Sequence, residues 1–396
     1  MMRLETFYQL LGPDGQQLLA EYGQEPVTRE NHLQLASRLR EVASSELASA
    51  VLETLILRQK AAAKFERAGS MYFTRDALEQ ASSEIVSRYR ASRYHEAGFT
   101  KIADLGCGIG GDALSLCQGA EVTGVEWNPL RLAMAQENVR IYGLSERFHP
   151  LQADLLELSP LEVPVLFADP GRRDEYGGRI YSVHDYRPPL STFEGWLDAV
   201  PHQGIKIGPG VDYAELPTGI EIEFVSVRGE VREGVLWRGD LRTEAGRRAT
   251  LLPGGATLTD FPVGSVEVAE PKEYLYEPDG AVIRAHLVEQ LAHGLNATKI
   301  DDNIAYLAAD DFQETEFARC YVIEDVMPFQ LKRLRSYLRD RRVGRLTIKK
   351  RGSPLDPDAL RKKLRLVGEE EMVIFLTKAA GKPTVLAGRD VAEKID

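Results

Sequence analysis

Residues 104–112 read DLGCGIGGD and directly follow KIA, so that a short apolar segment runs into a glycine-rich loop. Gly106, Gly108 and Gly111 satisfy GxGxxG between a predicted strand and a predicted helix, a pattern shared by dinucleotide-binding folds. Glycine lets the backbone approach a ligand closely and adopt dihedral angles that a Cβ resists. The stretch therefore predicts a strand–loop–helix unit that binds a cofactor.

Strand and helix patterns alternate around this loop, which predicts an α/β fold. Strands are expected at KIADL, EVTGVEW, FHPLQAD, VPVLFADP and GIKIGP, and helices at GDALSLCQ and PLRLAMAQENVRIYG. Strands separated by helices form right-handed βαβ units in a parallel sheet. Asn128 and Pro129 fit the start of the second helix, and Gly143 fits its end.

The flanking regions have different patterns and predict further domains. Residues 1–66 place apolar residues three and four apart, which is typical of an N-terminal helical module, and one long helix is expected from Thr74 to Gly98. From residue 220, EIEFVSV with EGVLWRG and RRATLL with ATLTDF read as hairpins. Residues 286–396 read as a small α+β domain, which leaves 67–285 for the Rossmann-like domain.

Composition narrows the class of protein. The 396 residues are 43% hydrophobic and 28% charged, which is ordinary for a folded chain of two or three domains. No apolar run reaches the roughly 20 residues of a membrane helix and no signal-peptide core is present, so we expect a cytoplasmic protein without a membrane partner. The three cysteines form no CxxC pair and lie near no histidine cluster, which argues against disulfides and metals.

Charge is distributed unevenly along the chain. The net charge of -11 argues mildly against a nucleic-acid partner, because phosphate binding needs a cationic surface. Residues 329–365, however, contain 14 Lys or Arg against three Asp, so this segment carries +11 and the remainder -22. The basic segment is the part of the chain best suited to phosphates.

Carboxylates at the ends of three predicted strands indicate which cofactor the loop binds. Asp104 would repel a pyrophosphate but attract the methionine ammonium of S-adenosylmethionine. Glu126, twenty residues after Gly106, can accept hydrogen bonds from ribose hydroxyls, and Asp154 ends the third strand, where it can bind the adenine amine; alternatively, either is a solvated strand end. We predict S-adenosyl-L-methionine as cofactor, bound by Asp104, Gly106, Cys107, Gly108, Gly110, Asp112, Glu126, Trp127 and Asp154.

The fourth strand ends in FADPGRR, residues 167–173, and supplies the candidate catalytic residues Asp169 and Pro170. Methyl transfer to a nucleophile mainly requires alignment, and a carboxylate can orient an exocyclic amine toward the methyl group. Arg172 and Arg173 can bind a phosphate, or can instead pair with the adjacent acids at 174 and 175.

The loop YGGRIYSVHDYRPP, residues 176–189, is expected to face the substrate. Tyr181 and Tyr186 are candidate stacking surfaces for bases, and their alternative is aromatic packing under the loop. The segment Met71-Tyr72-Phe73-Thr74 either folds over the cofactor or packs in the core. Lys206 reads as a solvated lysine at a strand end.

Residues 71–239 resemble the class I methyltransferases, which implies a Rossmann-like sheet of seven strands. Asp104, Gly106 and Gly108 match the acidic-glycine loop of that family, Glu126 its ribose acid and Asp154 its adenine contact. Amine-specific members carry Asp/Asn-Pro-Pro and an aromatic after the fourth strand. Asp169 and Pro170 match this motif, whereas Gly171 and Arg172 depart from it.

The whole chain resembles a bacterial methyltransferase family with a THUMP-like C-terminal domain, similar in its catalytic part to trimethylguanosine synthases. The matching segments are KAAAKF, MYFTRDALEQAS, DPGRR, YLYEPDGAVIRAH and IKKRGSPLDPDALRKKLRL. The resemblance implies RNA, either tRNA or rRNA, as the partner. Lys349, Lys350 and Arg351 would then contact phosphates; otherwise they form a solvated basic face.

These observations predict methylation of an exocyclic base amine in RNA, such as guanine N2. The overall acidity leaves a small-molecule or protein methyltransferase open. The departures at Gly171 and Arg172 leave open an RNA-binding protein that binds the cofactor without turnover.

Overall fold

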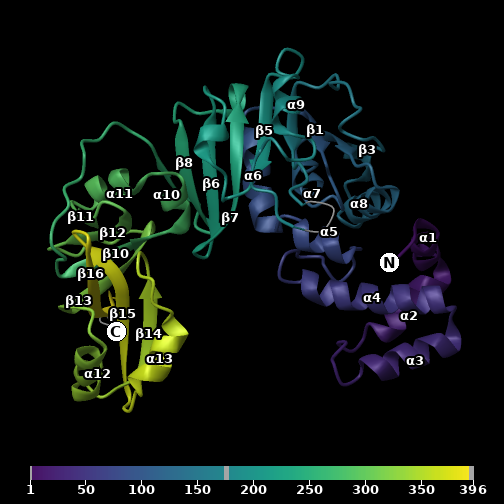
Figure 1. Ribbon diagram of the computed structural model, residues 1–396. Helices are drawn as coiled ribbons and strands as arrows, with labels where there is room; N and C mark the ends of the chain where they lie inside the picture. Colours follow the sequence, from purple (N-terminus) through teal and green to yellow (C-terminus); the bar gives the residue numbers. More distant parts are fainter. Residues whose placement is uncertain (1, 174–177, 392–396) are drawn as a thin grey trace. The chain divides into compact units, whose positions relative to one another are not determined.

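The computed structural model describes residues 2–173 and 178–391, and the chain divides into two compact units (Figure 1). Unit 1 comprises residues 1–221 and 233–244, and unit 2 comprises residues 222–232 and 245–396. The domain limits expected at residues 66 and 286 stay predictions. None of the helices in the two described ranges has both the length and the apolar character that crossing a bilayer requires.

Unit 1 begins with four helices that contact one another, α1 (Leu4–Leu11), α2 (Pro13–Tyr22), α3 (His32–Val42) and α4 (Ser45–Ala61). Helix α4 starts at the N-cap Ser44, whose hydroxyl accepts a hydrogen bond from the Leu47 amide at 3.3 Å. The buried side chains of these helices, including Phe7, belong to the same hydrophobic core as Ile102 and Val122 of the sheet. The helical pattern expected at the N-terminus is present, and it packs directly on the α/β part of unit 1.

The long helix expected from Thr74 to Gly98 is divided into α5 (Arg75–Gln80) and α6 (Glu84–Glu96). Thr74 is the N-cap of α5, as predicted, with its hydroxyl accepting from Ala77 at 3.2 Å. The chain leaves the helical region at Ala81, with ψ of 137°, and Ser83 is the extended N-cap of α6. Serine favours helix starts over helix interiors because its side chain competes for backbone hydrogen bonds. The break gives Ser82 a buried position near the site described below.

Five parallel strands form the centre of unit 1 in the order β3-β2-β1-β4-β5. They are β1 (Lys101–Leu105), β2 (Glu121–Val125), β3 (Phe148–Leu151), β4 (Val165–Ala168) and β5 (His202–Ile207), connected in part by α7 (Ala113–Leu116), α8 (Pro129–Ile141) and α9 (Leu190–Glu194). In register, Asp104 lies opposite Gly124 on one side and Phe167 on the other. The loops that follow these strands therefore meet at one edge of the sheet.

Antiparallel strands complete this sheet. The expected hairpin consists of β6 (Glu221–Val227) and β7 (Glu230–Arg238), and its turn residues Arg228 and Gly229 have φ of 52° and 85°. A second hairpin contains β8 (Arg247–Leu252) and β9 (Ala256–Thr259). The full order is β3-β2-β1-β4-β5-β7-β6-β8-β9, so the sheet has nine strands. The seven expected strands are the first seven in this order, and the second hairpin extends them.

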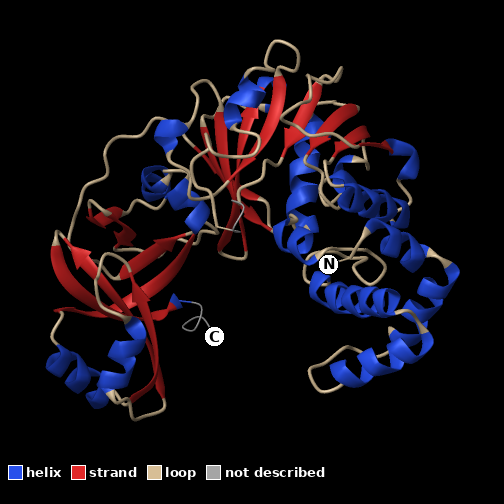
Figure 2. Cartoon of the chain, turned by 45° about the vertical axis from the view of Figure 1, so that its right-hand side comes forward, coloured by secondary structure: helices blue, strands red, loops and turns tan. Residues whose placement is uncertain are grey.

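Unit 2 contains a second sheet, of seven strands in the order β11-β12-β10-β13-β16-β15-β14 (Figure 2, red). Its strands are β10 (Tyr274–Pro278), β11 (Thr298–Asp301), β12 (Ile304–Ala309), β13 (Ala318–Pro328), β14 (Val343–Lys350), β15 (Glu370–Ala379) and β16 (Lys382–Asp390). The helices of unit 2 are α10 (Gly280–Arg284), α11 (Val288–Gly294), α12 (Leu331–Asp340) and α13 (Pro357–Leu364).

Neighbouring side chains of β15 pack in two different hydrophobic cores, one on each face of the sheet in unit 2. Ile374 packs with Leu334 of α12 and Leu360 of α13, while its neighbour Phe375 packs with Tyr306. Successive strand side chains point to opposite faces, so the helices α12 and α13 cover one face of this sheet. The expected α+β character of the C-terminal region is confirmed.

Candidate functional site

The glycine loop lies tightly between its neighbours in unit 1. Gly106, Gly108 and Gly110 have φ of 83°, 56° and 82°, in the left-handed region. A Cβ at Gly106 would lie 2.9 Å from the carbonyl oxygen of Asp169, and one at Gly110 would lie 3.3 Å from Ala135. The loop thus needs glycine both for its conformation and for its approach to the end of β4 and to α8.

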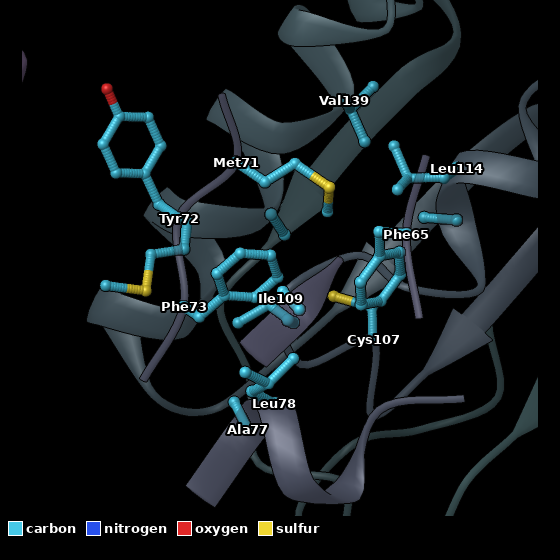
Figure 3. Packing of buried hydrophobic residues seen from close by; sticks show 14 of the residues in the cluster. Phe65, Met71, Tyr72, Phe73, Ala77, Leu78, Cys107, Ile109, Leu114 and Val139 are labelled. Carbon is cyan, nitrogen blue, oxygen red and sulfur yellow. The ribbon is translucent and has the colours of Figure 1, made fainter. Parts of the chain in front are cut away.

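Apolar side chains anchor the loop in the core: Figure 3 shows Cys107 and Ile109 of the loop in the same buried cluster as Phe65 and Phe73. Cys107 is 6% exposed, so a contact between this residue and a cofactor would come from its main chain. Burial raises the pKa of the Cys107 thiol well above its ordinary value, with Asp104 and Glu126 acting in the same direction. The cysteine is therefore an uncharged packing residue.

The segment at residues 71–74 was expected either to fold over the cofactor or to pack in the core, and its first three residues pack in the core. Met71, Tyr72 and Phe73 are at most 3% exposed. The Tyr72 amide donates to Asn138 Oδ1 at 2.8 Å, and Asn138 Nδ2 donates to the carbonyls of Tyr72 at 2.9 Å and Ile109 at 3.0 Å. Asn138 thereby connects this segment to the backbone of the glycine loop.

Glu126 is buried rather than solvated, with 5% of its surface exposed. Its Oε2 accepts from the Gly108 amide at 3.1 Å and its Oε1 accepts from the Asn128 amide at 2.9 Å. Burial raises the pKa of Glu126 above its ordinary value, although the hydrogen bond from Asn128 opposes the shift. The neighbouring Trp127 is 64% exposed. Glu126 therefore holds the glycine loop against β2, directly beside the expected ribose position.

Asp154 lies outside the strand that was expected to end with it. Strand β3 ends at Leu151, and Asp154 begins a turn in which its Oδ1 accepts from the Leu156 amide at 2.9 Å. The residue is exposed. Its contact with adenine stays a prediction, made from a loop rather than from a strand end.

Arg90 of α6 is the centre of a buried ionic cluster. Its side chain is 2% exposed and pairs with Asp112 and with Glu233, whose oxygens lie 2.6 and 2.5 Å from Nη2. Nη2 also donates to Ser82 Oγ at 3.2 Å, and the guanidinium lies 4.4 Å from the ring centroid of Phe167. Burial lowers the pKa of Arg90, but Asp112 and Glu233 raise it above its ordinary value. The predicted cofactor ligand Asp112 is thus engaged by Arg90.

Asp104 is a buried carboxylate without compensation. It is 1% exposed, and neither of its oxygens accepts a hydrogen bond from the residues that the structure describes. Burial raises its pKa well above the ordinary value, Asp112 and Asp169 add to the rise, and Arg90 opposes it. An unpaired buried carboxylate is costly, and a ligand cation placed beside it recovers that cost. The orphaned oxygens fit the ammonium group of S-adenosylmethionine.

Asp169 follows β4 and faces a buried lysine. Its amide donates to the carbonyl of Leu105 at 3.0 Å, and its Oδ2 accepts from Lys206 Nζ at 2.7 Å. Burial alone would raise the pKa of Asp169, but Lys206 and Arg172 bring it below its ordinary value. Pro170 is buried. The carboxylate is ionised and held at the edge of the sheet where the glycine loop also lies.

Lys206 differs from its expected role as a solvated strand end, since it is only 3% exposed. It lies within β5 between Ile205 and Ile207, and its Nζ donates to Ser82 Oγ at 3.1 Å as well as to Asp169. Parallel strands are covered on both faces, which is why a strand residue of either orientation is buried here.

The arginines after Pro170 occupy a partly exposed segment. Arg173 has a side chain that is 51% exposed, and its Nη2 lies 4.0 Å from Glu79 Oε2. The carbonyl of Arg172 accepts from the Ile180 amide at 2.9 Å. Their alternative partners Asp174 and Glu175 lie outside the described residues. A phosphate contact by either arginine stays a prediction.

The two loop tyrosines differ in exposure. Tyr181 is 62% exposed and keeps the surface that stacking requires. Tyr186 is 2% exposed, and its hydroxyl accepts from the Gly208 amide at 3.0 Å, so its ring packs beneath the loop. The stacking role expected for Tyr186 is therefore not available in this structure, because the ring supports the turn after β5.

The basic residues 349–351 belong to unit 2 and differ in their contacts and in their exposure. Lys349 pairs with Glu277 and lies 5.2 Å from the ring centroid of Tyr321. Arg351 lies 5.1 Å from the ring centroid of Tyr306. Lys350 is exposed. Only part of this predicted phosphate surface is thus freely exposed, because two of the three cations already contact unit 2 side chains.

Arg90, Glu233, Ser82 and Lys206 were missed as site residues. Only Lys206 carried a local signal, an ionisable residue between two isoleucines in a central strand. Over both described ranges, His, Cys, Asp and Glu side chains form no group of three or more that could hold a metal ion.

Three family models match separate parts of the chain. Residues 99–180 match the RNA cap guanine-N2 methyltransferase family, and residues 318–390 match the THUMP domain-like family. Residues 3–61 match a domain of unknown function, DUF8688. The first match contains the glycine loop and Asp169, and the second contains β13 to β16.

One curated relative matches most of the chain, and another matches a third of it. An uncharacterized S-adenosylmethionine-dependent methyltransferase of Mycobacterium tuberculosis is 33% identical over 83% of this chain and 92% of its own length. The trimethylguanosine synthase of Schizosaccharomyces pombe is 27% identical over 33% of this chain and 55% of its own.

Among solved structures, a candidate methyltransferase from Porphyromonas gingivalis W83 has the same fold. Its TM-score is 0.74 at 21% identity, covering 92% of this chain and all of that one. The glycine loop, the orphaned Asp104 and the similarity to the mycobacterial protein agree with one another. The chain belongs to the S-adenosylmethionine-dependent methyltransferases and carries a THUMP-like domain near its C-terminus.

Proposed function

We propose that this methyltransferase modifies RNA, at an exocyclic base amine such as guanine N2. The observation that carries the proposal is the ionised carboxylate of Asp169, partly exposed at the end of β4 with Oδ2 held by Lys206 at 2.7 Å. The similarity of residues 99–180 to the guanine-N2 methyltransferase family supports it. The similarity of residues 318–390 to THUMP domains supports an RNA partner, tRNA or rRNA.

The residues around the glycine loop would hold the cofactor. Asp104 would pair with its ammonium, Glu126 would accept hydrogen bonds from its ribose, and Asp154 would contact the adenine. When bound, S-adenosylmethionine supplies a methyl group on positively charged sulfur. Because that carbon is already activated, the chain's own residues need only to bind the two reactants and align them.

Asp169 would orient the acceptor. An N–H of the amine donates to the carboxylate, which directs the nitrogen lone pair at the methyl carbon and stabilises the positive charge that develops on nitrogen. The nitrogen–carbon bond forms as the carbon–sulfur bond breaks, with its electron pair left on sulfur. The nitrogen then loses one proton to solvent. No strong acid or base is required of the protein.

Other residues would bind the RNA around this amine. Tyr181 offers an exposed ring for a flanking base, and Arg172 and Arg173 offer guanidinium groups for a phosphate. Lys350, with the exposed cations of α12 and α13, would contact phosphates that position the RNA without reading its sequence.

A transfer assay tests the proposal. Purified protein with radiolabelled cofactor is given total RNA, a protein extract or a metabolite pool, and label is expected in RNA, with a methylated guanine among its nucleosides by mass spectrometry. Asp169→Ala should lower turnover roughly 100-fold or more and leave cofactor binding nearly unchanged. Label in protein or metabolites alone would contradict the RNA proposal, as would cofactor binding without transfer to any pool.

A further inference from the structure

The two oxygens of the Asp169 carboxylate have different surroundings. Lys206 Nζ lies 2.7 Å from Oδ2, whereas no described residue donates a hydrogen bond to Oδ1. The Asp169 side chain is 23% exposed and the Lys206 side chain 4%. One oxygen is therefore fixed from inside unit 1, and the other is left for a group that comes from outside.

We propose that Lys206 is a positioning residue for methyl transfer, holding Asp169 Oδ2 so that Oδ1 meets the N–H of the acceptor amine. The inference rests on the proposed function and deepens it, because it assigns the orientation of Asp169 to a residue on a different strand. Lys206 itself touches neither the acceptor nor the methyl group.

The surroundings of Lys206 explain why it is available to Asp169. Arg90 takes the other two carboxylates of the cluster, Asp112 and Glu233, in direct ion pairs. Ser82 Oγ accepts from Arg90 at 3.2 Å and from Lys206 at 3.1 Å, and so gives the ammonium a second fixed partner besides Asp169. Arg90 thus has two carboxylate partners in direct ion pairs, and Lys206 has one.

Stability alone does not require a lysine at this position. Burying an ion pair costs desolvation that its attraction barely repays, and apolar side chains of similar size are often as stable. A cation at 206 is explained by what it does to Asp169.

The arrangement favours acceptors that carry an N–H. A carboxylate held as an ion by Lys206 accepts hydrogen bonds well but takes up protons poorly, since burial is opposed by Lys206 and Arg172 and the pKa of Asp169 lies below its ordinary value. A neutral amine needs only an acceptor, whereas a hydroxyl needs a base to become nucleophilic. The pair therefore suits amine over hydroxyl methylation.

A double-mutant cycle tests the coupling. Wild type, Lys206→Met, Asp169→Asn and the double variant are compared for kcat and for KM of the cofactor, with total RNA as acceptor. Lys206→Met is expected to lower kcat about 10- to 100-fold with cofactor KM within about two-fold. If Lys206 acts through Asp169, the double variant is no slower than Asp169→Asn, because that variant already lacks the held carboxylate.

The pH profile provides a readout that a purely structural role does not move. Without the cation, the pKa of Asp169 rises, so the acid limb of kcat shifts to higher pH in Lys206→Met. Lys206→Arg keeps the charge and should keep the wild-type acid limb. The groups that face Lys206 are Asp104 of β1, Asp112 before α7, Arg90 of α6 and Asp169 after β4, and none is altered in these two variants.

Controls separate this inference from folding and from the proposed function. Lys101→Met changes an exposed lysine at the far end of β1 and should leave kcat and the pH profile unchanged. Thermal unfolding and calorimetry with S-adenosylmethionine report whether each variant is folded and binds. Two results would overturn the role of Lys206. One is a kcat of the double variant lowered by the product of the two single-variant factors, and the other is a Lys206→Met enzyme with the kcat and the acid limb of wild type.

Failure of the proposed function gives a different result. If the wild-type protein labels a protein or metabolite and not RNA, the RNA substrate is wrong, and the same cycle is then run on the labelled acceptor. A wild-type protein that labels no acceptor would overturn both.

Discussion

Arg90 on α6 and Glu233 on β7 are 143 residues apart in the sequence and share two hydrogen bonds, of 2.6 and 2.5 Å, inside unit 1. Both side chains are at most 3% exposed. Arg90 also pairs with Asp112 beside the glycine loop. A single guanidinium therefore neutralises two buried carboxylates and links α6, β7 and the start of α7.

Arg90→Met is expected to destabilise the protein by about 3–5 kcal/mol, because it leaves two buried carboxylates without a cation. The measurement is urea unfolding at pH 7. Arg40→Met, which changes an exposed arginine of α3, should alter the free energy of unfolding by no more than about 0.5 kcal/mol. A loss below about 1 kcal/mol in Arg90→Met would mean that the cluster is not compensated through Arg90.

Asp104→Asn is expected to stabilise the ligand-free protein at pH 7 and to weaken cofactor binding. The folded-state pKa of Asp104 lies well above its unfolded value of about 3.9. Its favourable contribution is therefore complete below about pH 4 and is lost as the pH rises through the folded pKa. Asparagine does not ionise, so the Asp104→Asn variant does not lose this stability as the pH rises.

Thermal unfolding at pH 4 and pH 7 checks the first part, with a gain over wild type expected only at pH 7. Calorimetry with S-adenosylmethionine checks the second, with affinity about 10-fold or more lower. Asp198→Asn, at an exposed position, serves as the control for both. Equal unfolding temperatures at pH 7 together with unchanged affinity would contradict the pairing of Asp104 with the ammonium.

Glu126→Ala is expected to weaken cofactor binding by about 1.5–3 kcal/mol, the value of a hydrogen bond to a charged group. The variant loses the predicted ribose contact and also the bonds that the Gly108 and Asn128 amides donate to Glu126. Calorimetry measures the change, and Glu121→Ala, at the exposed opposite end of β2, should bind as wild type does. Wild-type affinity in Glu126→Ala would remove this residue from the site.

Neutralising residues 349–351 is expected to change the salt dependence of RNA binding by about one unit rather than three. Lys349 already pairs with Glu277, and Arg351 lies against Tyr306, so Lys350 is the cation most free to contact phosphate. Fluorescence anisotropy with labelled tRNA over a range of salt concentrations measures the slope. Lys350→Ala alone should give nearly the whole change in slope. A slope unchanged both in this variant and in the triple variant would mean that residues 349–351 do not contact RNA phosphates.

Sequence patterns predicted the parts of the fold that local periodicity controls. The five parallel strands, the Asn128 cap and the Arg228–Gly229 hairpin turn appear where expected, because strand alternation and capping depend on neighbouring residues. The break between α5 and α6 was not predictable in this way. Residues 74–98 read as one helix, and Ser82 leaves that pattern to bind Arg90 and Lys206, the latter from a distant strand.

The carboxylates of the candidate site were predictable from the sequence, but the cations that pair with them were not. Asp104 lies near the end of β1, and Glu126 and Asp169 directly follow β2 and β4, so their positions are readable from the order of elements. The cations that set their charge come from elsewhere in unit 1, and no spacing rule relates residue 90 to 233 or 169 to 206. Charge compensation inside a protein depends on tertiary contacts, so it becomes visible only in the folded chain.

The N-terminal helices and the sheet share one hydrophobic core, and this constrains how the gene can change. The rings of Phe7 in α1 and Tyr72 meet edge to face with centroids 5.4 Å apart, and Gln16 donates to the Tyr72 hydroxyl at 2.9 Å. A larger or smaller side chain on either side needs a matching change on the other. Descendants of this gene are therefore expected to keep or lose the N-terminal helices and the sheet of unit 1 together. They are also expected to vary at positions 7 and 72 as a pair.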